Sequence, residues 1–168
     1  PMDGVVGLAD LELTGPYRGM FGSGQLRIDR GTAWGESFGG ATATLAFEGS
    51  GLRLSGIEMS KSTGGIRGAA WVGWDGRYAF DVDGERVPVE SLDRFRLDVA
   101  PLSGQLKFTA HGAGEFDSPT YEFEGTIPDL SAGDEVIGPV RGSFGVKGNV
   151  LSMDLGATSN RLDIAGTG

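Results

Sequence analysis

The chain has 168 residues, among them 31 glycines and no cysteine, and its formal net charge at pH 7 is −9. This length is typical of one domain, and the missing cysteines exclude disulfides, thiolate catalysis and cysteine-ligated metal sites. The 14 lysines and arginines are scattered singly, which argues against a nucleic-acid surface and against adsorption to an anionic membrane. Strand-like sequence lies close to both ends, so we expect residues 1–168 to be a single segment of a longer protein.

The N-terminal third of the chain predicts strands joined by glycine-rich turns. Apolar and polar residues alternate over residues 9–13 and 26–28, which is the period of a half-buried strand. Residues 41–47 and 52–54 alternate in the same way and predict a hairpin. A β-bulge is expected at Ser55-Gly56, because the apolar series continues after it with the opposite parity.

Residues 66–89 predict three short strands separated by two-residue turns at Asp75-Gly76 and Asp83-Gly84. Type I′ hairpin turns favour this dipeptide, since both central residues need a positive φ. The first turn sets Trp71 opposite Phe80, and the second sets Asp81 opposite Arg86. This register predicts one shared apolar face made of Trp71, Tyr78, Phe80, Val82, Val87 and Val89.

The next stretch contains the one helix candidate, one or two turns over residues 89–95. A strand at residues 106–110 and another at residues 121–127 follow, with residues 111–119 predicted as the loop between them. Residues 128–132 and Pro139 are also predicted to lie in loops, because proline cannot donate a hydrogen bond to a sheet.

The last stretch, residues 142–164, repeats the hairpin pattern. A turn at Gly148-Asn149 sets Val146 opposite Leu151 and Phe144 opposite Met153. A second turn at Ser159-Asn160 sets Ala157 opposite Leu162. The apolar stripe therefore stays on one face through successive hairpins.

The whole pattern predicts about ten to fourteen strands, more than a flat open sheet usually supports. The sheet must therefore curl, close or stack. An apolar sheet face is usually buried in a hydrophobic core, but the sequence predicts no helix that could cover this one. Two alternatives follow: a sheet folded onto itself around a dry core, or an open trough that marks a ligand or partner site.

Candidate catalytic and metal-binding residues are few. His111 is the sole histidine, and no Gly-x-Ser-x-Gly motif accompanies it. Residues 81–85 resemble a calcium loop only faintly and are better explained as a turn between strands. The glycines at residues 22–24 and 112–114 do not open a helix, as a phosphate-binding loop requires. Glu122 and Glu124 fit the solvated side of a half-buried strand. We expect no enzymatic activity, no catalytic residue, no cofactor and no metal.

The order of several motifs resembles the TamB/AsmA-like family of bacterial envelope proteins. In that family a glycine-flanked strand, an aromatic strand after a turn, a short helix-like link and a long glycine-containing strand follow one another, and a proline comes next. The resemblance covers most of residues 40–168, whereas residues 1–39 resemble the family only in the general character of their sequence. The segments that carry the resemblance include Gly64-Gly65-Ile66-Arg67-Gly68, Trp74-Asp75-Gly76-Arg77-Tyr78-Ala79-Phe80, Val87-Pro88-Val89-Glu90-Ser91-Leu92, Leu102-Ser103-Gly104-Gln105-Leu106 and Ser118-Pro119.

The resemblance implies an all-β fold, a long antiparallel meander curled into a taco-like open sheet with an apolar concave groove. It also implies a non-enzymatic segment of a periplasmic bridge, whose parent is anchored in the inner membrane. Such a bridge carries phospholipid or other acyl chains towards the outer membrane and can aid outer-membrane protein assembly. An outer-membrane barrel partner would be contacted through other parts of the parent.

The residues predicted to line this lipid-binding groove are the apolar members of the alternating strands. They are Leu45, Phe47, Leu52, Leu54, Tyr78, Phe80, Val82, Leu106, Phe108, Tyr121, Phe123, Phe144, Val146, Leu151 and Met153.

Two other functions are consistent with the pattern. One is a structural β-stalk or solenoid passenger with a sealed core. The other is a chaperone-like holder of unfolded β-strands that uses edge pairing. Open sheet edges also predict that the segment associates with itself.

Overall fold

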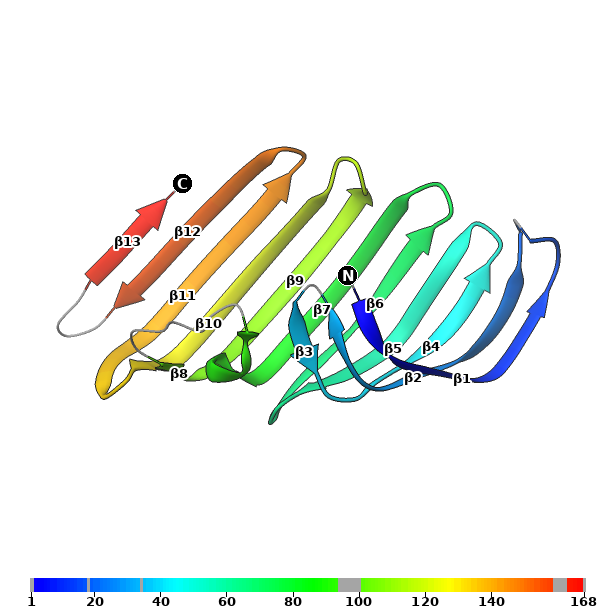
Figure 1. Cartoon of the computed structure of the whole chain (residues 1–168). Helices are drawn as coiled ribbons and strands as arrows, with labels where there is room; N and C mark the ends of the chain where they lie inside the picture. Colours follow the sequence, from blue (N-terminus) through cyan, green and yellow to red (C-terminus); the bar gives the residue numbers. More distant parts are fainter. Residues whose placement is uncertain (1, 18, 34, 94–100, 159–162, 168) are drawn as a thin grey trace.

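The computed structural model describes residues 2–17, 19–33, 35–93, 101–158 and 163–167, which form one antiparallel sheet of 13 strands (Figure 1). The strands are β1 (Met2–Thr14), β2 (Phe21–Ala33), β3 (Glu36–Phe38), β4 (Ala41–Glu48), β5 (Gly51–Lys61), β6 (Gly64–Gly73), β7 (Arg77–Pro88), β8 (Leu102–Ser103), β9 (Gln105–Glu115), β10 (Thr120–Ala132), β11 (Glu135–Lys147), β12 (Val150–Thr158) and β13 (Asp163–Thr167). One 3₁₀ turn, η1 (Val89–Ser91), follows β7.

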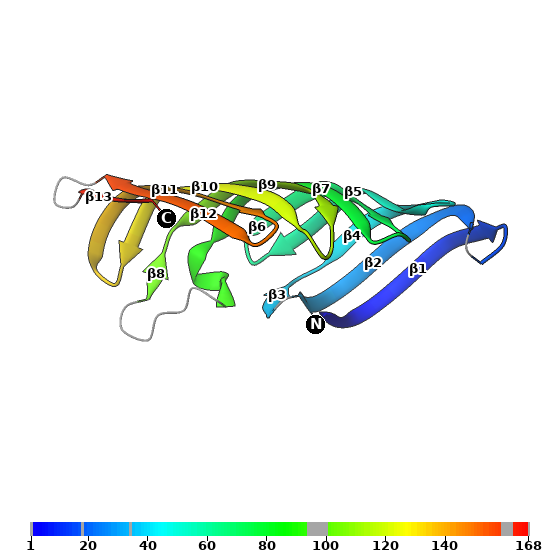
Figure 2. The same ribbon diagram turned by 90° about the horizontal axis from the view of Figure 1, so that it is seen from above.

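The strand order is that of a meander: β1-β2-β4-β5-β6-β7-β9-β10-β11-β12-β13, with β3 paired to β2 and β8 paired to β10. Seen from above, the sheet is a single curved layer that ends in β1, and β3, β8 and η1 lie on its concave side (Figure 2). The sheet is not closed into a barrel. The predicted fold class, a long antiparallel meander curled into an open sheet, is confirmed.

Two predicted hairpins are present, one with its predicted register and the other with its predicted bulge. Across the β11–β12 turn, Val146 pairs with Leu151 and Phe144 with Met153. Across the β4–β5 turn, Phe47 pairs with Leu52, and the ladder between β5 and β6 shifts after Leu54 at the predicted bulge. In both hairpins the turn residues fix the register locally, so the alternation of side chains is sufficient to assign the faces.

The predicted register of the β6–β7 hairpin is wrong by one residue. The turn is closed by the Gly76 N–H, which donates to the Gly73 carbonyl over 3.1 Å. Phe80 therefore pairs with Ala70, and Trp71 pairs with Ala79. Because side chains alternate along a strand, Trp71 lies on the face opposite Phe80.

The predicted turn at Asp83-Gly84 does not exist, because β7 runs straight through it. Gly84 pairs with Ile66 on β6 and with Phe108 on β9. A Cβ atom at residue 84 would lie 2.0 Å from Phe108 Cε1, so glycine makes room for that ring. The predicted Asp81–Arg86 pair is also wrong, since Asp81 pairs with His111.

Of three predicted loops, those at residues 128–132 and Pro139 are strand, and the one at residues 111–119 is a turn only over residues 116–119. Residue His111 and the glycines at residues 112–114 belong to β9, which continues to Glu115. Residues 128–132 lie in β10, where the register shifts between Ile127 and Leu130, and Pro139 lies in β11. Irregular pairing lets a strand contain a residue that lacks an N–H donor.

The remaining predicted elements fall partly outside the described residues. The helix predicted over residues 89–95 is only the single turn η1 within the described part. The turn predicted at Ser159-Asn160 lies outside it. The β12–β13 ladder pairs Ala157 with Ile164, so the predicted pairing with Leu162 is wrong by two residues.

Gly68 provides a direct test of how closely neighbouring strands approach. We expect Gly68→Ala to destabilise the fold by about 1–3 kcal/mol, as overpacked sites do, because the new Cβ would lie 2.2 Å from the Asp81 carbonyl oxygen. The matched control is Gly65→Ala on the same strand, where no atom lies within 4 Å. Urea unfolding of both variants measures the difference, and equal midpoints would contradict the expectation.

Candidate functional site

The concave face is the candidate functional site because it is a broad apolar surface on a one-layer sheet. The solvent-accessible surface of the chain is 11223 Å². A compact monomer of 17.5 kDa exposes about 7,900 Å². The buried aliphatic side chains of the described residues are few, namely Ala41, Ala43, Leu45, Val87, Val89 and Ala157. Much of the apolar surface of this sheet therefore faces solvent.

All fifteen residues predicted to line the groove lie on this concave face. Cross-strand pairing places them in rows, of which one is Val82, Ala110, Phe123, Phe144 and Met153. Leu45 is buried, whereas Phe144, Leu151 and Met153 are exposed. The other eleven are half-buried. Their placement follows from the ladder, and their role as lipid-binding residues remains a prediction.

Aromatic side chains form a continuous cluster over the middle strands of the concave face. The Phe108 and Phe123 rings stack with centroids 5.3 Å apart, and Phe123 stacks on Phe144 at 4.9 Å. Tyr121 meets Phe144 edge-on at 6.2 Å. Such pairs add about 0.5–1.5 kcal/mol beyond their buried area, so the cluster joins β9, β10 and β11 without a second layer.

Val72 is among the residues of this face that the sequence did not assign to it. Val72 pairs with Leu52 and with Tyr78, so it shares their side of the sheet. It was missed because the predicted register of the β6–β7 turn assigned Trp71 to this face. The pair of alanines at residues 69 and 70 carries no alternation signal that could have corrected the error.

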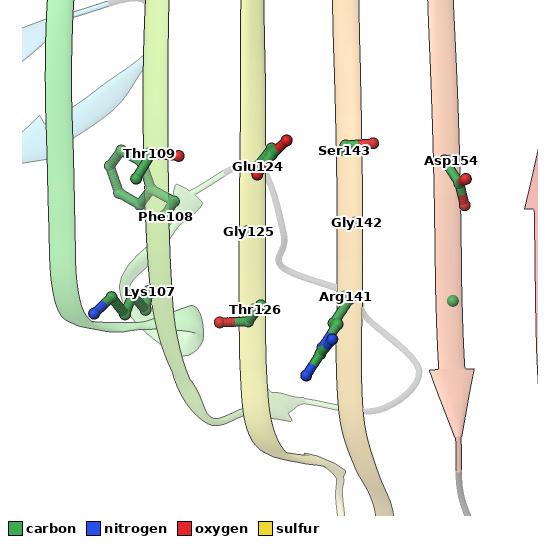
Figure 3. A pocket seen from close by; sticks show the side chains of 11 residues that line it. Lys107, Phe108, Thr109, Glu124, Gly125, Thr126, Arg141, Gly142, Ser143 and Asp154 are labelled. Carbon is green, nitrogen blue, oxygen red and sulfur yellow. The ribbon is translucent and has the colours of Figure 1, made fainter.

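The opposite face is polar, and two hollows of the sheet lie on it. The larger, of about 490 Å³, is lined by side chains of alternate residues that include Lys107, Glu124, Arg141 and Asp154 (Figure 3). The second, of about 470 Å³, lies around Thr42, Glu58 and Arg67. Their polar side chains are open to solvent, as on any half-buried sheet.

Residues considered for catalysis or metal binding also lie on the polar face. His111 Nε2 is 3.3 Å from Glu122 Oε2, and both side chains are mostly exposed. Asp81 and Asp83 lie within strand β7, in contrast to the loop that calcium binding requires. Over the described residues, no group of three or more histidine, aspartate or glutamate side chains could hold a metal ion.

One end of the sheet is covered by a charge cluster that we call the clasp, in which Lys61 is buried and Glu36, Ser37 and Asp93 are partly or fully exposed. The Lys61 side chain is 6% exposed, and its Nζ lies 3.1 Å from Glu36 Oε2 and 3.8 Å from Asp93 Oδ2. It also donates to the Ser37 carbonyl. The Ser37 N–H and hydroxyl donate to the Asp93 carboxylate over 3.1 and 2.9 Å.

The clasp ties β3 to the segment after η1, across a separation of 56 residues. The Asp93 N–H completes it by donating to Glu36 Oε2 over 2.9 Å. Val87 and Val89, at the same end of the sheet, are almost completely buried. This end is therefore the most tightly packed part of the fold.

No helix in the described ranges combines the length and hydropathy needed to cross a membrane. Comparisons of the chain with protein-family models, with curated proteins and with solved structures found no match.

Proposed function

We propose that this chain is a non-enzymatic segment of a periplasmic bridge that carries phospholipid acyl chains between the inner and outer membranes. The observation that carries the proposal is the broad apolar concave face, which includes exposed Phe144, Leu151 and Met153 and over which the described residues form no second layer. An exposed apolar surface of this extent is a liability unless a ligand or partner covers it.

The geometry of the face supports a sliding ligand. Transfer of an acyl chain from water contributes about 0.8 kcal/mol per buried methylene. Neighbouring strands lie about 4.8 Å apart, and each presents similar side chains in the rows described above. A chain that moves by one strand therefore exchanges one set of apolar contacts for a nearly equivalent one, which keeps barriers low.

The periplasmic location and the anchored parent rest on the resemblance to TamB/AsmA-like proteins. An outer-membrane barrel partner would be bound by other parts of the parent. The open, half-exposed face favours the conduit over a stalk with a sealed core, because a sealed core would bury Phe144 and Met153 as completely as Leu45.

Photo-crosslinking tests the proposal. A photoreactive amino acid replaces Phe80, Phe108 or Phe144, and the protein is irradiated with phosphatidylethanolamine vesicles. We expect phospholipid adducts at all three positions by mass spectrometry. The matched control is Thr109, which neighbours Phe108 on β9 but is exposed on the polar face.

Each outcome decides between the candidate functions. Adducts at the three phenylalanine positions and none at Thr109 support the conduit. An absence of lipid adducts at all three rejects it and favours the stalk. Equal yields at Thr109 and Phe108 also reject it, since binding would not depend on the face. Peptide adducts in cell extracts, in place of lipid, favour the chaperone-like holder.

A further inference from the structure

The two ends of the strands differ sharply in exposure. One end carries the clasp, η1 and the turns at residues 62–63 and 133–134, and we call it the closed edge. The other carries the turns around residues 15–17 and 19–20 and at residues 49–50, 74–76, 116–119 and 148–149, and we call it the hairpin rim (Figure 1).

Strand β12 runs from the rim to the closed edge, and the exposure of its side chains changes along it. The exposed fraction of its concave-face residues falls from 62% at Leu151 to 53% at Met153, 42% at Leu155 and 8% at Ala157. On this strand, apolar surface is therefore most accessible near the rim.

Exposed aromatic residues gather at the hairpin rim. Tyr17, Phe21, Trp74 and Phe116 are between 49% and 87% exposed, and each lies in or beside a rim turn. Of the exposed aromatic residues among those described, Phe144 is the one away from these turns. Aromatic side chains at an edge between apolar and wet surroundings are typical of contact with the headgroup level of lipids.

Two of these aromatics extend the concave face to the rim. The Trp74 ring lies 6.4 Å from the Phe47 ring, and its Nε1–H donates to the Gly49 carbonyl over 3.0 Å. Phe116 stacks on Tyr78 at 5.3 Å. Since Phe47 and Tyr78 belong to the concave face, a ligand on that face would meet Trp74 and Phe116 where it leaves the sheet.

Charge does not distinguish the two edges, because the arginines at the rim are paired with carboxylates and the rim also carries Glu115 and Asp117. At the rim, Arg53 binds Glu48 and Arg77 binds Asp75, each with a closest distance of 2.6 Å. The hydrogen bond from Arg77 holds the pKa of Asp75 below its usual value, so this carboxylate stays ionised and paired. The closed edge carries the acidic residues of the clasp and, at the β10–β11 turn, Asp129, Asp134 and Glu135.

We propose that the hairpin rim is the headgroup side of the lipid path, with the acyl chains directed from the rim towards the closed edge. The inference rests on the proposed function and specifies it: headgroups travel along the rim, across the strands, while the clasp keeps the other edge shut. A uniform trough open at both edges would let headgroups leave on either side.

Tryptophan fluorescence tests the orientation, because Trp74 is a natural reporter at the rim. Replacing Trp34 and Trp71 by phenylalanine leaves Trp74 as the single tryptophan. Two further single-tryptophan proteins, each lacking all three native tryptophans, carry Phe144→Trp on the concave face or Val136→Trp. Val136 is 75% exposed at the closed edge and is the matched control.

Each protein is incubated with vesicles of phosphatidylcholine that carry a nitroxide quencher either on the choline or near the acyl-chain end, and is then separated from the vesicles. We expect several-fold stronger loss of Trp74 fluorescence with the choline label than with the chain label. Phe144→Trp should show the reverse, and Val136→Trp should lose little fluorescence with the choline label.

The outcomes separate the inference from the proposed function. If Phe144→Trp is not quenched by the chain label, no lipid occupies the face and the proposed function fails. If Phe144→Trp is quenched but the choline label acts equally on Trp74 and Val136→Trp, the function stands and the orientation is wrong. If Trp74 is quenched only while vesicles are present, the rim docks on bilayers and the inference is overturned.

Discussion

Leu45→Asp is expected to unfold the domain, whereas Phe144→Asp is expected to leave it folded. Both residues lie on the concave face, but Leu45 is 5% exposed and Phe144 is 38% exposed. A carboxylate at residue 45 would lose its hydration without gaining a partner, which is among the most destabilising changes a core can suffer. At residue 144 the carboxylate can remain in water.

The expected magnitudes are well separated. We expect Leu45→Asp to lower the free energy of unfolding by more than about 4 kcal/mol. Phe144→Asp should lower it by about 1–3 kcal/mol, through the lost burial of a ring that is 38% exposed and the lost stacking on Phe123. Urea unfolding followed by circular dichroism measures both.

Leu45→Ala is the control for lost packing alone, with an expected loss of about 2–5 kcal/mol, so Leu45→Asp must exceed it. If Phe144→Asp unfolds the protein as fully as Leu45→Asp does, the concave face is a sealed core in solution. If Phe144→Asp stays folded, this variant can be used to test lipid binding. A charge in the aromatic cluster should then reduce the yield of lipid adducts at Phe108.

The fold class was predictable because period-two alternation and turn chemistry are local signals. The β11–β12 hairpin shows this best: Gly148-Asn149 allows a tight turn, and the alternation on either side permits only the register that pairs Phe144 with Met153. The same local reasoning located the bulge that follows Leu54.

The errors arose where a local signal had a distant cause. Asp83-Gly84 has the composition of a turn, but Gly84 is required by the ring of Phe108, which belongs to a strand more than twenty residues away. The turn at Asp75-Gly76 was predicted at the correct place, but the predicted pairing of the strands across it was off by one residue. This error assigned Trp71 to the wrong face of the sheet.

The sequence could predict most of the residues that lie on the concave face, but it could not predict how strongly each of them is exposed to solvent. Alternation assigns a residue to a face and says nothing of what lies over it, so Leu45 and Leu151 look alike in sequence. The clasp was invisible for a similar reason. Glu36, Lys61 and Asp93 are far apart in the chain, and each resembles an ordinary surface charge until the fold brings them together.

Lys61→Met is expected to open the closed edge of the sheet. It removes the buried cation that binds Glu36 and the Ser37 carbonyl and lies near Asp93. Loss of one partner from a fully buried ionic cluster is destabilising by about 3–5 kcal/mol. Glu36 and Asp93 are 27% and 32% exposed, so we expect a loss below this range but above the ~1 kcal/mol of an exposed pair. Hydrogen exchange of the Ser37 and Asp93 amides, which donate to clasp carboxylates, should accelerate, and the urea midpoint should fall.

The matched control is Lys107→Met, which removes a lysine from an exposed pair with Glu85 at 3.3 Å. Exposed pairs contribute less than about 1 kcal/mol, so this variant should unfold near the wild-type midpoint. Equal effects of the two substitutions would mean that the clasp does not hold β3 in place. If the clasp does shut this edge, Lys61→Met should also increase quenching of Val136→Trp by choline-labelled lipid, because headgroups would then reach both edges.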